Sequence, residues 1–281
     1  MNMFQKKLLQ SCMSKGMSVQ DMYEQLQMQR DLCKKMMDHE EECFARKVYK
    51  KSCMTVANYG ATQRTSRADV IYQLKNMNST FLEDLESSEL NMFCNMVFWS
   101  LEEAAPSSME FLNYFRKLLR FVLKHKDCVY FNNPLTGFPV ALRVKEQETK
   151  DYVYKIMGKN VKTVLVTELQ TTHSQKTTTS SVPGIIHSID AAILVMLKDG
   201  LMEEDMSFIH DSCGLHPNNI EKAKESVYTA LNTVMNGNVL QSIVDQLLEG
   251  IEDVPDHLKT APYQGTWTGE INEETSYYAY S

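Results

Sequence analysis

The sequence contains no C-x-x-C pair, and its seven cysteines are an odd number. A zinc ribbon or a disulfide-stabilised scaffold needs paired cysteines, so both classes are disfavoured and a reducing compartment is indicated. No apolar run approaches the roughly 18 residues that a membrane helix needs. The basic N-terminal segment lacks arginine and a secretory hydrophobic core, so a transit peptide is only weakly supported.

An excess of positive charge is absent: 36 acidic residues outnumber 29 lysines and arginines, and the net charge is −7. This is a mild argument against a protein that simply coats nucleic acid. One stretch is an exception: from Phe44 to Ala68 there are six basic residues and no acidic residue. Arg46 and Lys50 are four residues apart, hence on one helix face, where a guanidinium fork and an ammonium group can hold a triphosphate. Taken alone, the run is explained more simply as a solvated basic face.

The 281 residues allow one large domain or two small ones. Apolar spacing together with start and stop signals predicts helices over most of 19–57, 80–103, 107–126, 188–198 and 219–235. Strand patterns cover 152–155, 161–166 and 207–210. The Thr- and Ser-rich residues 171–181 are predicted to form a loop. The fold class predicted is α+β, mainly helical, with a small antiparallel sheet.

The stretch FIHDSCGLHP begins at Phe208 as a strand and reaches His210-Asp211 before a glycine turn. A carboxylate at the tip of such a hairpin can hold Mg²⁺, which prefers oxygen ligands. A simple hydrophilic turn is an equally good explanation of this stretch alone. A metal cluster of His210, Cys213 and His216 lacks a fourth ligand at matching spacing. A nucleophile built from Cys213 and a histidine has nothing else to support it.

A third segment places His187 and Asp190 in an apolar helix that follows Val182-Pro183. Taken alone, His187 is better explained as a core histidine with satisfied hydrogen bonds. The order of the three segments along the chain adds information that none of them carries alone.

Three motifs occur in order: Arg46-x3-Lys50 … Tyr59-Gly60, then Val182-Pro183-x3-His187-Ser188-x-Asp190, then His210-Asp211-Ser212-x-Gly214. Together they resemble the single-subunit DNA-directed RNA polymerases of bacteriophages and mitochondria. Four further segments are similar to that family: Val19-x-Asp21-x-Tyr23, Thr136-Gly-Phe-Pro-Val140, Lys176, and the Tyr-Tyr-Ala-Tyr-Ser end. The resemblance therefore extends from about residue 18 to residue 281.

The resemblance implies two-metal transfer of ribonucleotides with Mg²⁺ as cofactor. It assigns Asp211 as a metal carboxylate, with His210 and Lys50 in the same catalytic centre. It also implies a fingers-like region over 1–186 and a palm-like region over 187–281.

The same resemblance implies the nucleotide contacts. Arg46 and Lys50 would hold the incoming triphosphate, while Tyr59 and His187 would favour ribose over deoxyribose. The expected ligands and partners are a DNA template, an RNA product and ribonucleoside triphosphates, with no membrane. The expected location is the cytoplasm of a bacterial host, for a phage-encoded protein, or alternatively a mitochondrion.

One departure from the family concerns the second metal carboxylate. The segment with Arg46 and Lys50 resembles the family's nucleotide-binding helix. The family carries the second carboxylate in an Asp-Gly motif before that helix, whereas the only Asp-Gly here is Asp199-Gly200, after it. The chain is then half of a split polymerase, a degenerate remnant, or a truncated sequence. The initial Met1 and the family-like C-terminus favour a split enzyme whose partner chain supplies the N-terminal half and the other catalytic aspartate.

Two rivals stay open at this point. A nucleic-acid-binding remnant without catalysis is opposed by the joint presence of Arg46, Lys50 and Asp211. A fragment of a family A DNA polymerase is disfavoured by Ser212, because those enzymes usually carry a glutamate after His-Asp.

A second departure from the family is an extra residue before Tyr59. It would turn the Tyr59 ring away from Lys50 unless the helix contains a π-bulge.

Overall fold

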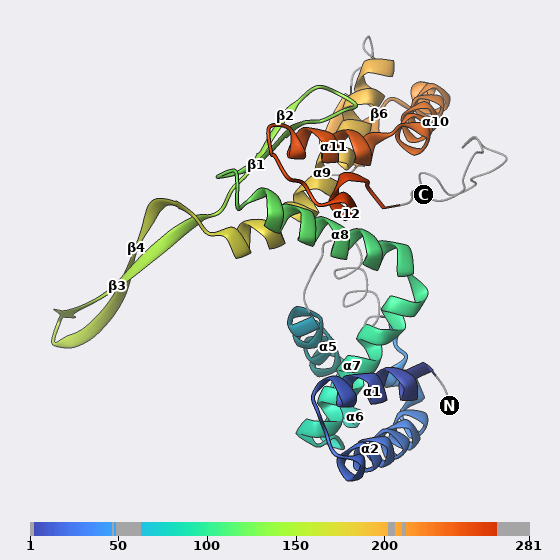
Figure 1. The fold of residues 1–281 in the computed structure, drawn as a ribbon, viewed down its shortest axis with the longest axis vertical. Coiled ribbons are helices and arrows are strands. Elements are labelled where there is room, and N and C mark those ends of the chain that lie inside the picture. The colour runs from blue at the N-terminus through green and yellow to red at the C-terminus, as the bar shows by residue number, and fades with distance from the viewer. Residues whose placement is uncertain (1–2, 47, 49–62, 202–205, 210–211, 263–281) are drawn as a thin grey trace. The chain divides into compact units, whose positions relative to one another are not determined.

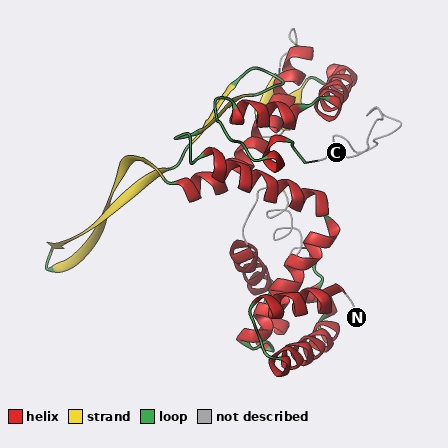
Figure 2. Ribbon diagram, viewed as in Figure 1, coloured by secondary structure: helices red, strands yellow, loops and turns green. Residues whose placement is uncertain are grey.

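The computed structural model describes residues 3–46, 48, 63–201, 206–209 and 212–262. The predicted fold class is confirmed: the described part of the chain is mainly helical, and its strands form small antiparallel two-stranded sheets (Figure 2). The chain divides into two compact units, Met1–Leu112 and Asn113–Ser281. The predicted division into fingers-like and palm-like regions at residue 186 stays a prediction; that position lies inside a continuous helix.

The helices of the first unit are α1 (Met3–Ser14), α2 (Val19–Asp38), α3 (Glu40–Cys43), α5 (Gln63–Asn76), α6 (Thr80–Glu83) and α7 (Ser87–Ala104), and α8 (Pro106–Val122) runs into the second unit. A capping box starts α2: the Ser18 hydroxyl accepts a hydrogen bond from the Asp21 amide, and the Asp21 carboxylate accepts one from the Ser18 amide. Proline has a fixed φ that suits the first helical position, so α8 starts at Pro106, one residue before its predicted start.

The prediction that residues 19–57 are mostly helical is confirmed for their described part, which is divided at His39 into two helices. The backbone of His39 has φ −120° and ψ 40°, which ends α2, and α3 starts at the next residue. The division coincides with contacts to a neighbouring segment, because the side chains of His39 and Glu42 make hydrogen bonds to α6 and its flanking residues. The part of that prediction from residue 49 onward lies outside the described residues.

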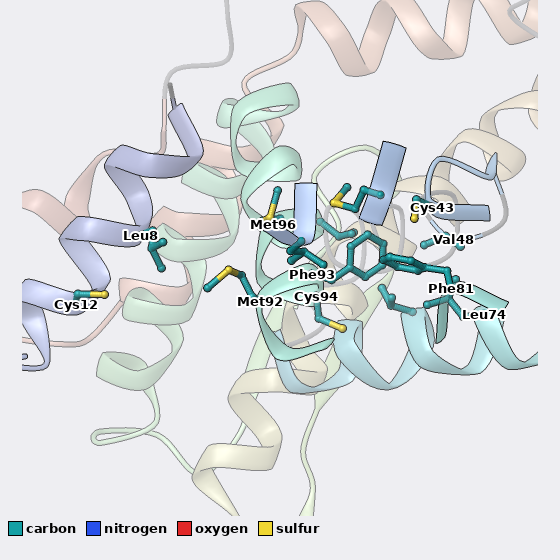
Figure 3. Close-up of a cluster of buried hydrophobic side chains, with 14 residues drawn as sticks. Leu8, Cys12, Cys43, Val48, Leu74, Phe81, Met92, Phe93, Cys94 and Met96 are labelled. Carbon is teal, nitrogen blue, oxygen red and sulfur yellow. The ribbon is translucent and has the colours of Figure 1, made fainter. Parts of the chain in front are cut away.

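A contiguous apolar cluster forms the core of the first unit. Figure 3 shows most of its members: Leu8, Cys12, Cys43, Val48, Leu74, Phe81, Met92, Phe93, Cys94 and Met96. The Phe81 and Phe93 rings meet edge to face with centroids 5.1 Å apart, a geometry that adds about 0.5–1.5 kcal/mol to their burial. Burial raises the pKa of the Cys43 thiol to about 12 and that of Cys94 to about 11, so both thiols are uncharged and unreactive at neutral pH.

The second unit holds all the described strands. Its elements are β1 (Val129–Asn132), β2 (Pro139–Leu142), β3 (Lys145–Ile156), β4 (Lys159–Thr172), α9 (Ser174–Gly200), β5 (Met206–Ile209), β6 (Ser212–Leu215), the 3₁₀ helix η1 (Pro217–Asn219), α10 (Ile220–Asn236), α11 (Val239–Leu248) and α12 (Asp256–Lys259). The predicted strands on either side of Gly158 are confirmed, although both are longer than expected. The predicted helix that stops at Gly237 is confirmed as α10.

The predicted loop over 171–181 is wrong, because α9 already starts at Ser174. Its hydroxyl groups bond within the helix, as when Thr178 donates to the Ser174 carbonyl at 2.9 Å. The buried Thr177 hydroxyl also accepts from the Val144 amide at 3.0 Å, which fixes the first turn of α9 to the end of the β1–β2 hairpin. These local bonds offset the poor helix propensity of threonine and serine.

Close packing of α9 involves two of its glycines. A Cβ atom on Gly184 would lie 2.7 Å from a methyl carbon of Leu142 in β2. A Cβ atom on Gly200 would lie 2.5 Å from the Ser226 hydroxyl in α10. The sequence contains no unbroken apolar run of membrane length, yet α9 as a whole is long and apolar enough to cross a membrane by length and composition alone. In the structure it packs against β2 and α10.

The β3–β4 pair is a long two-stranded ribbon that extends away from the helices of its own unit (Figure 1). Met157 and Gly158 have φ values of 50° and 76°, as a two-residue hairpin turn of the primed type requires. Nearly every residue of both strands is exposed. The ribbon is therefore held by its own hydrogen bonds and cross-strand pairs and not by a core.

Candidate functional site

The β5–β6 hairpin carries the predicted metal aspartate. Its strands pair antiparallel with Ile209 opposite Ser212, and two residues connect them. These two residues are His210 and Asp211, which lie outside the described residues. The predicted hairpin is present, but the predicted glycine turn is wrong: Gly214 lies inside β6, opposite Ser207, because the strands already pair from Ser212 onward.

One face of this hairpin packs onto two helices. Met206, Cys213 and Leu215 contact a small apolar cluster made of Leu197 and Leu201 at the end of α9 and Ala223 of α10. A strand pair with one face packed has a fixed register, because a slip of one residue would bring polar side chains to the apolar cluster. The register of β5 with β6 is therefore supported by the end of α9 and the start of α10.

The two alternative roles of Cys213 lose support from its surroundings. Its side chain packs in the apolar cluster, and the His216 ring caps η1 by accepting a hydrogen bond from the Asn218 amide at 3.3 Å. Both residues thus have structural roles. Within the part of the chain that the structure describes, no three His, Cys, Asp or Glu side chains gather closely enough to hold a metal ion.

His187 and Asp190 lie on the exposed side of α9, three residues apart. The explanation of His187 as a core histidine is therefore wrong: its ring faces outward. Asn133, in the turn between β1 and β2, donates a hydrogen bond from its amide nitrogen to the Ser188 carbonyl at 2.7 Å. This bond ties the turn before Thr136-Gly-Phe-Pro-Val140 to the helix that carries His187.

Sequence reasoning missed two residues that support this part of the site. Asn133 is 2% exposed, and its carbonyl oxygen also accepts from the Leu135 amide at 2.9 Å, so it organises the turn as well as the contact to α9. Gly184 allows α9 to approach β2 closely. The available signals were an Asn-Pro turn dipeptide and a glycine directly after a proline inside a helix.

Arg46 is helical and exposed, and it follows the buried Cys43 by three residues. Val48, two residues further, is fully buried in the core of the first unit. The apolar contacts below thus leave the Arg46 guanidinium on the surface. Lys50 and Tyr59 lie outside the described residues. Arg46 belongs to the first unit and His187 to the second.

The β3–β4 ribbon offers a surface that fits nucleic acid. Its distal half, residues 150–165, carries Lys150, Lys155, Lys159 and Lys162 but only one acidic residue, Asp151. Tyr152 and Tyr154 project from one face of the same half and are each 46% exposed. Lysines attract phosphates, and exposed aromatic rings can stack on bases.

Comparison with known proteins points to one family. A family model described as DNA-dependent RNA polymerase matches residues 10–275 of the chain. The chain is also 25% identical, over 183 residues, to a probable DNA-directed RNA polymerase from Gelasinospora sp. (strain G114). That match covers 65% of this chain but only 22% of the relative, so the chain spans much less than the relative's full length.

Proposed function

Because the chain belongs to the DNA-dependent RNA polymerase family, we propose that it is the catalytic C-terminal subunit of such a polymerase. The reaction is ribonucleotide addition on a DNA template, in which an RNA 3′-hydroxyl attacks the α-phosphate of the incoming triphosphate and pyrophosphate leaves. The observation that carries the proposal is the β5–β6 hairpin, whose register makes His210 and Asp211 the two connecting residues.

The donor chemistry of the hairpin fits Mg²⁺. Asp211 supplies carboxylate oxygens, the ligands that Mg²⁺ prefers, and the packed face of the hairpin would keep their position fixed. Bound Mg²⁺ would supply stabilisation of the negative charge on the attacking and leaving oxygens. His210, beside Asp211, is proposed to belong to the same catalytic centre.

The nucleotide contacts are proposed for residues of both units. Arg46 would bind the triphosphate with its planar fork of N–H donors, and Lys50 would add a point charge one helical turn away. His187, exposed on α9, would contact the ribose together with Tyr59.

The second catalytic carboxylate is assigned to a partner chain. The only Asp-Gly in the sequence is Asp199-Gly200, and Gly200 already serves to let α9 pass close to Ser226 of α10. Packing therefore accounts for this dipeptide without a catalytic role. Two metals need more than one carboxylate, and the proposal assigns the second one to an aspartate of the partner chain.

The template would contact the β3–β4 ribbon. Its distal half carries four lysines and only one aspartate, and the side chains of Tyr152 and Tyr154 are exposed to solvent. These features support a nucleic-acid partner despite the net charge of −7. The acidic character of the rest of the chain is acceptable if the partner chain supplies further basic surface.

A tagged full-length chain, isolated from its native cells together with whatever copurifies, tests the proposal. The assembled complex should extend an RNA primer on a DNA template with Mg²⁺ and ribonucleotides, whereas the chain purified alone should not. Robust extension by the chain alone would contradict the partner requirement. If a complex that contains the intact chain fails to extend the primer on its template, that failure would contradict the catalytic role.

A further inference from the structure

A hydrogen-bonded cluster lies four residues before Arg46, where α3 meets the N-terminus of α6. The Glu42 carboxylate accepts three hydrogen bonds there: from the Ser79 hydroxyl, from the Thr80 hydroxyl at 2.8 Å and from the Phe81 amide at 3.1 Å. Ser79 and Phe81 are buried, so this contact is partly shielded from water. Glu42 thereby joins two segments that are almost forty residues apart in the sequence.

His39 closes this cluster from the other side. Its Nε2 lies 3.0 Å from the Asp84 carboxylate and its Nδ1 lies 3.3 Å from the Thr80 hydroxyl oxygen. The Thr80 hydroxyl donates to Glu42, so it links the His39 ring to the Glu42 carboxylate. His39 thus lies between Asp84 and Thr80 and joins the end of α2 to both ends of α6.

The segment around Arg46 is also held by apolar contacts to the core of the first unit. Cys43 and Val48 are fully buried in the core of the first unit, and Ala45 packs against the same core. These core contacts hold the segment against the first unit. Glu42 supplies a lateral contact to α6, whose Phe81 is itself fully buried.

We propose that Glu42 is a positioning residue for nucleotide binding, because it fixes the backbone that carries the Arg46 guanidinium. The inference rests on the proposed role of Arg46 in holding the incoming triphosphate. A bidentate guanidinium–phosphate contact depends on orientation, so a small rotation of the backbone weakens it without touching the reacting atoms.

The electrostatics of Glu42 agree with a permanently charged anchor. Hydrogen bonds from Ser79, from the Phe81 amide and from Thr80 hold the pKa of the Glu42 carboxyl below its usual value. At neutral pH the group is a carboxylate and accepts all three bonds. A glutamine of the same shape has one acceptor oxygen, and its NH₂ group would face donors.

The assembled polymerase with Glu42→Gln tests the inference by steady-state extension with varied ribonucleotide. We expect KM for the ribonucleotide to rise about five- to twentyfold while kcat changes less than about twofold, since the substitution disturbs binding geometry and leaves the reacting groups in place. Glu41→Gln is the matched control: Glu41 is exposed on the same short helix and should leave both constants within about twofold. A merely structural role of Glu42 would lower the active fraction and kcat without this selective rise in KM.

Arg46→Gln and the double variant complete the test. If Glu42 acts through Arg46, the double variant should have the KM of Arg46→Gln alone, because the guanidinium–phosphate interaction can be removed only once. An unchanged KM in Glu42→Gln, beside a raised KM in Arg46→Gln, would overturn the positioning role and leave the proposed function intact. An unchanged KM in Arg46→Gln would overturn the proposed triphosphate contact of Arg46 and, with it, the positioning role of Glu42. Should Glu42→Gln fail to fold, Thr80→Val removes one of the three donors and is judged by the same comparison.

Discussion

The two hairpins β3–β4 and β5–β6 are built from the same antiparallel pairing but stand in opposite environments. The short pair packs one face against Leu197, Leu201 and Ala223 and so joins the body of its unit. The long pair buries almost nothing: Val153, for example, is 62% exposed, and both of its faces are open. Isolated two-stranded ribbons are marginally stable in water, so the long pair is expected to gain order when a partner covers it.

The difference in burial between the two hairpins suits them to two different tasks, holding a catalytic group and contacting a template. A catalytic carboxylate has to be held within a fraction of an ångström, which needs a packed support like that of β5–β6. A surface that follows a template gains from reach and charge instead. We therefore expect substitutions in the short hairpin to act on chemistry or folding, and substitutions in the long ribbon to act on nucleic-acid affinity.

The largest effect is expected from Asp211→Asn in the assembled enzyme. The substitution removes a metal-binding charge with little change of shape, so primer extension should fall about 10⁴-fold, or about 5 kcal/mol, while copurification of the partner is kept. Asp151→Asn in the long ribbon is the matched control and should leave the chemical step unchanged. Extension by Asp211→Asn at a near-normal rate would show that His210-Asp211 is only a turn.

Leu197→Ala should give the next largest effect, this time on folding. Leu197 is 2% exposed under the β5–β6 hairpin, so the cavity left behind should lower the free energy of unfolding by about 2–5 kcal/mol. Val153→Ala in the ribbon should change it by less than about 0.5 kcal/mol, because its side chain is mostly in water already. Denaturant unfolding of the two variants measures the contrast, and similar losses would mean that the ribbon is part of a cooperative core.

The sequence predicted the elements that have strong local signals. Gly158 marks the turn of the long ribbon, where a residue with positive φ is needed, and Gly237 marks the end of α10. The predictions were wrong where long-range contacts decide. Nothing local tells that Thr177 meets Val144, which turns a Thr-rich loop into the first turn of α9. Nor does the local pattern reveal that Glu42 crosses to α6, which accompanies the break at His39.

The candidate site was predictable only as an ordered set of motifs. The sequence placed Asp211 between two strands, and the register of β5 with β6 agrees with that placement. The exposure of His187 could not be predicted, because an apolar helix with one histidine is compatible with either face. The contribution of Asn133 depends on a hydrogen bond to a residue fifty-five positions away, which no short motif encodes.

Shortening the long ribbon should have an intermediate effect. Replacing residues 150–165 with Asn-Gly would join the paired residues Thr149 and Val166 by a favourable two-residue turn. The replacement removes four lysines and one aspartate, a net loss of three positive charges. We expect affinity for the DNA template to fall about ten- to a hundredfold at low salt. The slope of log affinity against log salt concentration should become less steep by about three. Thermal unfolding should hardly change. Binding by fluorescence anisotropy measures the decrease, and full affinity at low salt would remove the ribbon from the template surface.

The smallest effect is expected from substitutions in the Lys162–Asp151 ion pair of the ribbon. These substitutions test whether the ribbon binds DNA through its net charge. The two groups are 2.7 Å apart, with side-chain exposures of 63% and 54%, so the pair should contribute less than about 0.5 kcal/mol to stability. Lys162→Gln and Asp151→Asn break the same pair but change the charge in opposite directions. If the ribbon attracts the template by charge, Lys162→Gln should weaken DNA binding about two- to threefold and Asp151→Asn should strengthen it by a similar factor. Titrations at two salt concentrations would separate the effects, since both should shrink as salt rises. A shift in the same direction for both variants would mean that the ion pair shapes the ribbon, and that net charge does not govern its affinity.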